Sequence, residues 1–115
     1  EMQIDCVVSE QVHALELGHD LQLNLYRILQ EQLRNIQKYA QASKVDICVD
    51  IEGDFLYMQI SDNGIGFDMS RVKRGIGIAN MKRRAELFGG KTVLISEPGN
   101  GCQVLVTIPL NRSAD

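Results

Sequence analysis

The sequence predicts an α+β fold, a two-layer α/β sandwich in which a mixed β-sheet is covered by helices on one face. Strand-like and helix-like segments alternate along the whole chain, and two pairs of strand segments are joined by turns too short for a crossover helix. The resulting order of strand, helix, strand, strand, helix, strand, strand differs from the strict alternation of a doubly wound fold. Such a sandwich leaves room for a ligand between the helices and the loops at one end of the sheet.

The first half of the chain contains a strand, a long helix and a hairpin. Residues 2–8 form the first predicted strand. A helix is expected over residues 20–42, with Asp20 as its N-cap, because a carboxylate at this position accepts hydrogen bonds from the first-turn N–H groups. Residues 44–51 are rich in β-branched side chains, and a Gly53-Asp54 turn joins them to a second strand over residues 55–61.

The second half contains another helix and another strand pair. Four apolar residues recur at helical spacing after Gly77, namely Ile78, Met81, Ala85 and Phe88. The pair Gly89-Gly90 is a strong C-terminal stop for this helix. Residues 91–96 and 103–109 are predicted strands, separated by the turn sequence Pro98-Gly99-Asn100-Gly101. No linker interrupts this pattern, so residues 1–115 are expected to form a single domain.

Composition narrows the range of functions. The 115 residues are 44% hydrophobic and 23% charged, which is typical of a soluble globular domain with a core of its own. A net charge of −3 argues against nucleic acid as a partner. The three cysteines, Cys6, Cys48 and Cys102, are odd in number and far apart, which indicates neither a disulfide framework nor a zinc site and favours a reducing, cytoplasmic setting.

Hydropathy and the first residue of the chain bear on its setting and on its completeness. No apolar run approaches the ~20 residues that a membrane-spanning helix needs. The chain begins at Glu1 rather than at Met, so we expect it to be a piece of a longer protein, whose other parts are free to include a membrane anchor.

Two glycine-rich segments suggest a phosphate-bearing ligand. The first is Asp62-Asn63-Gly64-Ile65-Gly66, and the second is Arg74-Gly75-Ile76-Gly77, directly before a predicted helix. Glycine lets the backbone approach a ligand closely, and the N–H groups at the start of a helix attract anions. The alternative is that both segments are ordinary turns, with Asp62 as a turn carboxylate, since short glycine motifs also arise by chance.

The long predicted helix carries an apolar and a polar stripe. At roughly 100° per residue, the expected core stripe consists of Tyr26, Leu29, Leu33, Ile36 and Ala40. A second stripe, nearly opposite, places Glu31, Asn35 and Lys38 at neighbouring positions. A solvated helix face is the alternative interpretation. However, an amide oxygen suits Mg²⁺, an ammonium suits phosphate and a carboxylate suits a general base, whereas Asn is a weak helix former.

Taken together, these segments resemble the ATP-binding catalytic domain of sensor histidine kinases. Residues 25–40 are similar to the N box of that domain, residues 62–67 to its first glycine box and residues 75–81 to its second. The resemblance extends from about residue 20 to residue 110 and implies the Bergerat-type fold of the GHKL ATPases. Glu31, where many histidine kinases carry Asn, together with the run over residues 81–90, is most similar to the subgroup that partners NarL-type response regulators.

The resemblance implies a role for individual residues. Asn35 matches the residue that holds Mg²⁺ at the phosphates, and Lys38 and Tyr39 match side chains near the phosphate chain. Asp62 matches the carboxylate that accepts the adenine amine. Glu31 matches the general base of the ATP-hydrolysing members of the family. The glycines at which the backbone passes close to the nucleotide are Gly64, Gly66, Gly75 and Gly77.

The chain departs from the family pattern in two places. The lid between the glycine boxes, residues 67–74, is short, so we expect weak ATP affinity and fast exchange, with Arg74 at its edge as a phosphate contact. Cys102 stands where the family usually has a Thr that helps to bind adenine, and a thiol is a poorer donor and acceptor. A reactive role for Cys102 is disfavoured, because no His or Lys lies nearby in the sequence to lower its pKa.

The implied function is therefore that of a histidine kinase catalytic domain, which binds ATP and Mg²⁺ and donates the γ-phosphate to a histidine on a separate dimerisation domain. His13 and His19 are expected to be surface residues and not acceptors. The isolated chain should be a monomer that does not phosphorylate itself, whereas its parent should be a homodimer with a response regulator downstream. The alternatives are an anti-sigma-type serine kinase and a nucleotide-binding interaction module without phosphotransfer.

Overall fold

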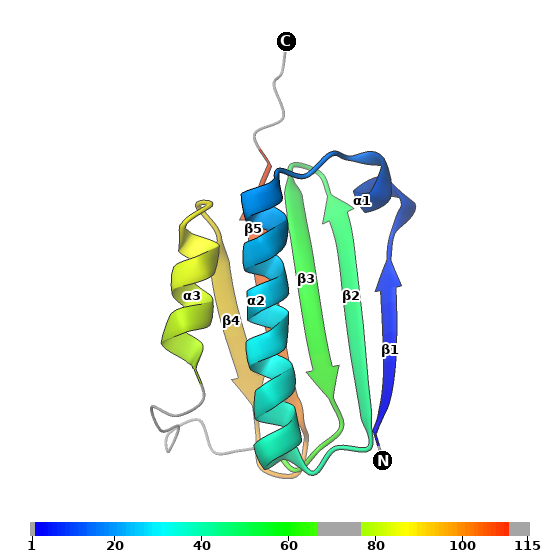
Figure 1. Ribbon diagram of the computed structural model, residues 1–115. Helices are drawn as coiled ribbons and strands as arrows, with labels where there is room; N and C mark the ends of the chain where they lie inside the picture. Colours follow the sequence, from blue (N-terminus) through cyan, green and yellow to red (C-terminus); the bar gives the residue numbers. More distant parts are fainter. Residues whose placement is uncertain (1, 67–76, 111–115) are drawn as a thin grey trace.

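The structure, a computed structural model that describes residues 2–66 and 77–110, has one layer of sheet and one layer of helices (Figure 1). In chain order the elements are β1 (Gln3–Val8), α1 (Glu10–Ala14), α2 (His19–Asn35), the π-helical turn η1 (Ile36–Ala40), β2 (Lys44–Glu52), β3 (Phe55–Asp62), α3 (Ile78–Glu86), β4 (Lys91–Ser96) and β5 (Cys102–Pro109). The five strands lie in the order β1-β2-β3-β5-β4. β1 and β2 are parallel and the other neighbours are antiparallel, so the predicted mixed sheet is confirmed.

Both predicted strand pairs are present. β2 and β3 pair from Val45 opposite Asp62 to Glu52 opposite Phe55, so each strand is one residue longer than expected. β4 has its predicted bounds, and β5 starts one residue early, at Cys102. The short helix α1 between β1 and α2 was not predicted. Its five residues are too few for a helical period to emerge from the sequence.

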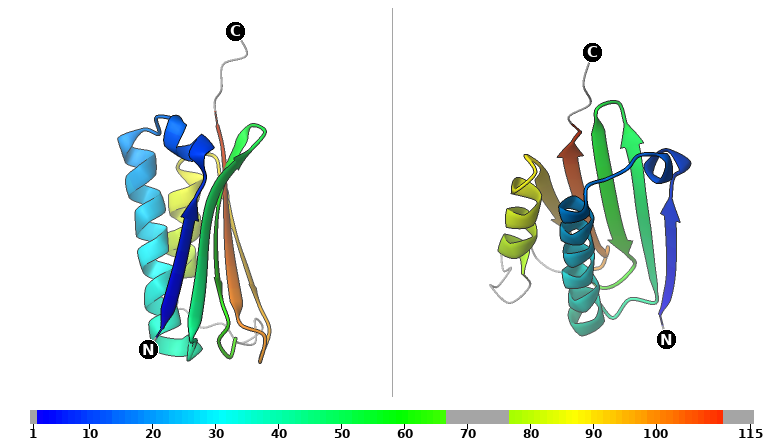
Figure 2. Two further views of the ribbon diagram at one scale, coloured as in Figure 1. Left: turned by 90° about the vertical axis from the view of Figure 1, so that its right-hand side faces the viewer. Right: turned by 45° about the horizontal axis from the view of Figure 1, so that its top comes forward.

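One face of the sheet is buried beneath the helices. α2 and α3 both lie on this face, as the edge-on view in Figure 2 shows. The inward-pointing residues of the central strand and its neighbour are Leu56, Met58, Ile60 and Asp62 in β3, and Cys102, Val104, Val106 and Ile108 in β5. Both rows are apolar along most of their length and finish, at the same end of the sheet, with Asp62 opposite Cys102. A chemically distinct group of side chains therefore lies at that end of the core.

The long helix begins and ends differently from the prediction. α2 begins at His19 with Gly18 as N-cap, so the assignment of Asp20 as N-cap was wrong. The α-helical part stops at Asn35, the π-helical turn η1 follows, and Gln41 takes a left-handed conformation (φ 51°) that ends the helix. Such π turns are local distortions that are frequent at functional sites.

The buried face of α2 is turned by about one residue, roughly 100°, from the predicted stripe. Tyr26 is 54% exposed, and Leu29 and Leu33 are only partly buried. The residues that face the sheet are Leu25, Ile28, Gln32, Asn35, Ile36 and Ala40. The prediction failed here because two of these are amides, which a pattern of apolar residues assigns to the solvent side.

The second helix agrees with its predicted spacing. Met81 and Ala85 are buried, and α3 begins directly after Gly77. The chain then turns at Gly90, whose amide donates to the Ala85 carbonyl at 2.9 Å. A Cβ on Gly90 would lie 2.5 Å from the Thr107 carbonyl oxygen, so only glycine fits at this helix end. Within residues 2–66 and 77–110, no helix is long and apolar enough to cross a membrane.

The core predicts a clear difference between two isoleucines. Ile60 in β3 is fully buried, whereas Ile95 in β4 is 53% exposed. Ile60→Ala should lower the free energy of unfolding by about 2–5 kcal/mol, because it leaves a cavity between the sheet and α2. Ile95→Ala, the matched control, should change it by no more than about 0.5 kcal/mol. Urea denaturation of both variants measures this difference, and equal losses would contradict the assigned core.

Candidate functional site

The candidate site lies where α2 ends, β3 ends and β5 begins, at the end of the sheet drawn lowest in Figure 1. Residues from these three elements, from η1 and from the first glycine segment line one cavity of about 20 Å³, namely Gln32, Asn35, Ile36, Tyr39, Ala40, Asp62, Gly66 and Cys102. A space of this size holds about one water molecule. The predicted residues Asn35, Tyr39, Asp62, Gly66 and Cys102 are therefore brought together from distant parts of the sequence.

Asp62 presents one bonded and one unbonded carboxylate oxygen. Its Oδ1 accepts a hydrogen bond from the Gly64 amide at 2.8 Å, which is the turn geometry that an Asp-Asn-Gly sequence favours. Its Oδ2 is buried and has no hydrogen-bond partner in the described part of the chain. Burial raises the pKa of this carboxyl above its usual value, against the opposing effects of the backbone N–H groups of Gly64 and Cys102. The turn interpretation therefore accounts for Oδ1 and leaves Oδ2 available for a donor.

A chain of side-chain hydrogen bonds connects α2 with β5. Nδ2 of Asn35 donates to Oε1 of Gln32 at 3.3 Å, and Nε2 of Gln32 contacts Sγ of Cys102 at 3.7 Å. Gln32 is only 2% exposed. The sequence analysis overlooked Gln32. The available signal was an amide three residues before Asn35, which places both on the same face of the helix.

Cys102 is a buried, neutral thiol. Burial, together with the nearby charge of Asp62, raises its pKa to about 11. At neutral pH the sulfur therefore stays protonated, which agrees with the interpretation that this cysteine is unreactive. It lies opposite Asp62 in the β3–β5 pairing and lines the small cavity.

The glycines of the first segment pack against the protein's own backbone. A Cβ on Gly64 would collide with the carbonyl of Ala40, and the neighbouring Ile65 amide donates to that same carbonyl at 2.8 Å. Gly66 has a φ of 65°, and a Cβ there would collide with the carbonyl of Glu97. These contacts fasten the segment to the end of η1 on one side and to the β4–β5 turn on the other.

Glu31 lies beside the start of α3. Gly77 caps this helix with a φ of 69°, and a Cβ on it would be 2.5 Å from Cδ of Glu31. The same carboxylate is 3.9 Å from the Arg34 guanidinium. A carboxylate at a helix N-terminus is electrostatically favourable. Glu31 and Gly77 therefore form a second group of predicted residues, beside the small cavity and not inside it.

The remaining predicted residues are not part of these two groups. Lys38 is exposed on η1 and does not line the cavity. Tyr39 lines it, although 49% of this residue remains exposed. Arg74, Gly75 and the short lid over residues 67–74 lie outside the described residues.

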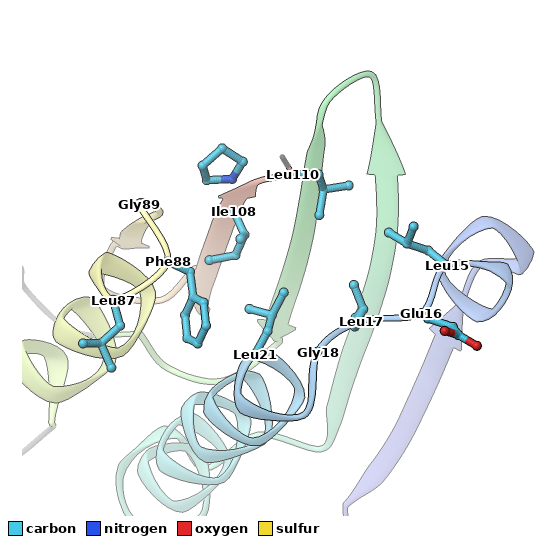
Figure 3. Close-up of a pocket in the computed structure, with 11 residues that line it drawn as sticks. Leu15, Glu16, Leu17, Gly18, Leu21, Leu87, Phe88, Gly89, Ile108 and Leu110 are labelled. Atoms are coloured by element: carbon cyan, nitrogen blue, oxygen red, sulfur yellow. The ribbon is translucent and has the colours of Figure 1, made fainter. Parts of the chain in front are cut away.

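A much larger pocket lies at the opposite end of the sheet. Figure 3 shows its apolar side chains converging from the start of α2, the turn after α3 and the end of β5, among them Leu21, Phe88 and Ile108. Its volume is about 660 Å³, yet none of the predicted site residues lines it. A comparison of these two pockets by size alone therefore points away from the buried carboxylate and amides.

Comparison with known proteins places the chain among ATPases. Residues 20–112 match the family model of histidine kinase-, DNA gyrase B- and HSP90-like ATPases. The sensor histidine kinase LiaS of Bacillus subtilis is 40% identical over 88 residues, which cover 76% of this chain and 24% of LiaS. The kinase/phosphatase DegS of Brevibacillus brevis is 33% identical, covering 78% of this chain and 24% of DegS. The chain thus spans about a quarter of the length of these relatives.

Solved structures show the same fold. A histidine kinase domain of the blue-light activated histidine kinase of Erythrobacter litoralis superposes with a TM-score of 0.77 at 14% identity, covering 95% of this chain and 52% of that one. The histidine kinase AdeS of Acinetobacter baumannii gives a TM-score of 0.72 at 13% identity, covering 96% and 55%. At these identities the likeness concerns the fold alone.

The buried carboxylate predicts a pH-dependent difference in stability. An unfolded Asp62 titrates near 3.8, and the folded protein holds this proton more tightly. The native state is therefore favoured below pH 3.8, and this advantage is lost as the pH rises through the folded pKa. Asp62→Asn should accordingly be more stable than the unmodified protein at pH 7, and the difference should shrink on acidification. Thermal unfolding at pH values from about 3.5 to about 7.5 tests this prediction. Asp54→Asn, at an exposed position, is the charge control. An Asp62→Asn variant that is less stable than the unmodified protein at pH 7 would contradict the prediction.

Proposed function

The chain belongs to the family of histidine kinase-, DNA gyrase B- and HSP90-like ATPases, and we propose that it is the ATP-binding catalytic domain of a two-component sensor histidine kinase. The observation that carries this proposal is the buried Oδ2 of Asp62, an acceptor without a partner among the described residues, on a side chain that lines the small cavity. An ionised carboxylate only accepts hydrogen bonds. The exocyclic amine of adenine is a donor that satisfies it.

The residues around the cavity suit a nucleotide with its metal. Oxygen ligands suit Mg²⁺, and the side-chain carbonyl of Asn35 would be the oxygen that this chain contributes. Bound there, Mg²⁺ would supply charge neutralisation at the phosphates. The cavity of about 20 Å³ is far smaller than a purine ring, so its walls must move apart when adenine enters. Ile36, Ala40 and Cys102 give it the apolar sides that a flat base requires.

Three residues form the proposed catalytic group. Asn35 would hold the cation, Lys38 would contribute a positive charge from its exposed place on η1, and Glu31 would contribute a carboxylate at the start of α3. Catalysis would rest on orientation and charge rather than on a covalent intermediate in this domain. Tyr39, Gly64, Gly66, Arg74, Gly75, Gly77 and Cys102 complete the proposed nucleotide contacts.

The phosphate acceptor would be supplied by another part of the parent protein. We place it on a histidine of a dimerisation domain, with a NarL-type response regulator as the next partner. The positions of the two histidines of this chain support an acceptor outside it. His13 and His19 belong to α1 and to the first residue of α2, at the opposite end of α2 from Asn35. At 1.5 Å per residue, His19 starts about 24 Å along the helix from Asn35.

A nucleotide-binding interaction module without phosphotransfer is the second candidate. It is favoured by one observation, namely that Lys38 is exposed and separate from the cavity. Such a module would bind ATP through Asp62 and signal by docking, with no acceptor histidine.

The base contact is tested by Asp62→Asn, which keeps the shape of the side chain and replaces an anionic acceptor by a neutral amide. ATP binding should weaken by about 1.5–3 kcal/mol, the range for a hydrogen bond to a charged group. Calorimetry on the purified chain measures this change, again with Asp54→Asn as the matched control. Unaltered ATP affinity of the Asp62 variant would remove Asp62 from base recognition.

Phosphotransfer separates the two candidate functions. The chain alone should be a monomer and should not become labelled by radiolabelled ATP. When the parent's dimerisation domain is added in trans, that domain should acquire acid-labile label slowly, at a rate that rises with its concentration. Label on His13 or His19 would show that the acceptor lies in this chain. ATP binding without label on any acceptor would establish the interaction module instead.

A further inference from the structure

Gln32 is a buried amide at a position where an apolar side chain would be buried at a lower cost in free energy. It is 2% exposed on the face of α2 that covers the sheet, beside Ile28 and Ile36. Burying an amide destabilises the folded protein unless hydrogen bonds compensate it. The hydrogen-bond partners of the Gln32 amide therefore indicate the function of this buried polar group.

Each end of the Gln32 amide has a partner inside the site. Its carbonyl oxygen accepts from Nδ2 of Asn35 at 3.3 Å, and its nitrogen contacts Sγ of Cys102 at 3.7 Å. Because the cysteine is a neutral thiol, the second contact is a weak one. The first contact is the stronger constraint, and it acts on the residue proposed to hold Mg²⁺.

The hydrogen bond to Gln32 selects one orientation of the Asn35 amide. The terminal torsion of asparagine is broad and roughly two-fold, so an unconstrained amide readily exchanges the places of its oxygen and nitrogen. An acceptor at Oε1 of Gln32 is satisfied only when the nitrogen of Asn35 faces it. The carbonyl oxygen of Asn35, which lies opposite the nitrogen in the same amide plane, then points away from Gln32, and this is the atom that would bind a cation.

We propose that Gln32 is a positioning residue that fixes the orientation of the Asn35 amide for Mg²⁺, and thereby couples the metal end of the site to the base end at Cys102. This proposal rests on the proposed function, in which Asn35 holds the cation. The affinity for Mg²⁺ would then depend on the carbonyl oxygen of Gln32, although Gln32 does not contact the metal. Removal of such supporting contacts typically weakens metal binding about 10–100-fold.

Two substitutions separate the acceptor from the volume of the side chain. Gln32→Leu replaces the amide by an apolar side chain of similar size, so it should fold, but it removes the acceptor. Gln32→Glu keeps an acceptor for Asn35. Calorimetric titration of ATP at a series of Mg²⁺ concentrations should show a requirement for about 10–100-fold more Mg²⁺ in the Leu variant, with Mg²⁺-free affinity changed less than about threefold. The Glu variant should retain the Mg²⁺ dependence of the unmodified protein.

The matched control is Gln37→Leu, the same chemical change at an exposed position of η1. It should leave both affinities unchanged. A second measurement needs no ligand: the side-chain NH₂ signals of Asn35 in ¹⁵N NMR should shift in Gln32→Leu and stay in place in Gln37→Leu. This measurement keeps the proposal testable if the buried Glu variant does not fold.

The outcomes distinguish this inference from the proposed function. If Asn35→Ala leaves the Mg²⁺ dependence intact, the metal role of Asn35 in the proposed function is wrong. If Asn35→Ala removes that dependence whereas Gln32→Leu preserves it, the positioning role of Gln32 is overturned. An equal loss of affinity with and without Mg²⁺ in Gln32→Leu, or unshifted Asn35 signals, would also overturn it, because Gln32 would then only shape the cavity.

Discussion

The antiparallel pairing of β3 with β5 is the constraint on which both the core and the site depend. Eight residue pairs join these strands, from Phe55 opposite Pro109 to Asp62 opposite Cys102. Since side chains alternate between the two faces, this register sends one row of each strand toward α2. A slip of one residue would expose the apolar row and would also move Asp62 to the open face of the sheet. Folding and formation of the site are thus decided by the same set of hydrogen bonds.

The site end of the core breaks the rules that the rest of the core obeys. Over most of the sheet, the residues between strands and helices are aliphatic, but at this end a carboxylate, two amides and a thiol are buried together. The amides are partly compensated by one another, whereas Oδ2 of Asp62 has no partner in the described part of the chain. Groups whose burial is costly and incompletely compensated are typical of binding sites, where a ligand completes the hydrogen bonding.

The sequence was sufficient for the fold class and for most strands, and it failed where packing decides. Short turns at Gly53 and Gly99 force antiparallel neighbours, so both strand pairs could be read from local signals. The orientation of α2 depends instead on how it rests against the sheet and α3. Apolar periodicity placed Tyr26 in the core and Asn35 on the opposite face of the helix. A pattern of apolar residues cannot identify an amide that is buried in a polar site. Gln32 was missed for the same reason.

The predicted site residues divide along a similar line. Asp62, Asn35 and Cys102 converge because strand register and helix position bring them there, while Lys38 remains on the surface of η1. Motif spacing specifies which residues belong to a family pattern, but the distance between their side chains depends on the π-helical turn that follows Asn35.

The packing of Gly64 and Gly66 against carbonyls of Ala40 and Glu97 has a further consequence for mutational scanning. A side chain at either position would displace backbone before it met any ligand. Lost binding in such a variant would therefore report the integrity of the loop, and glycine in this segment is a requirement of folding as much as of recognition.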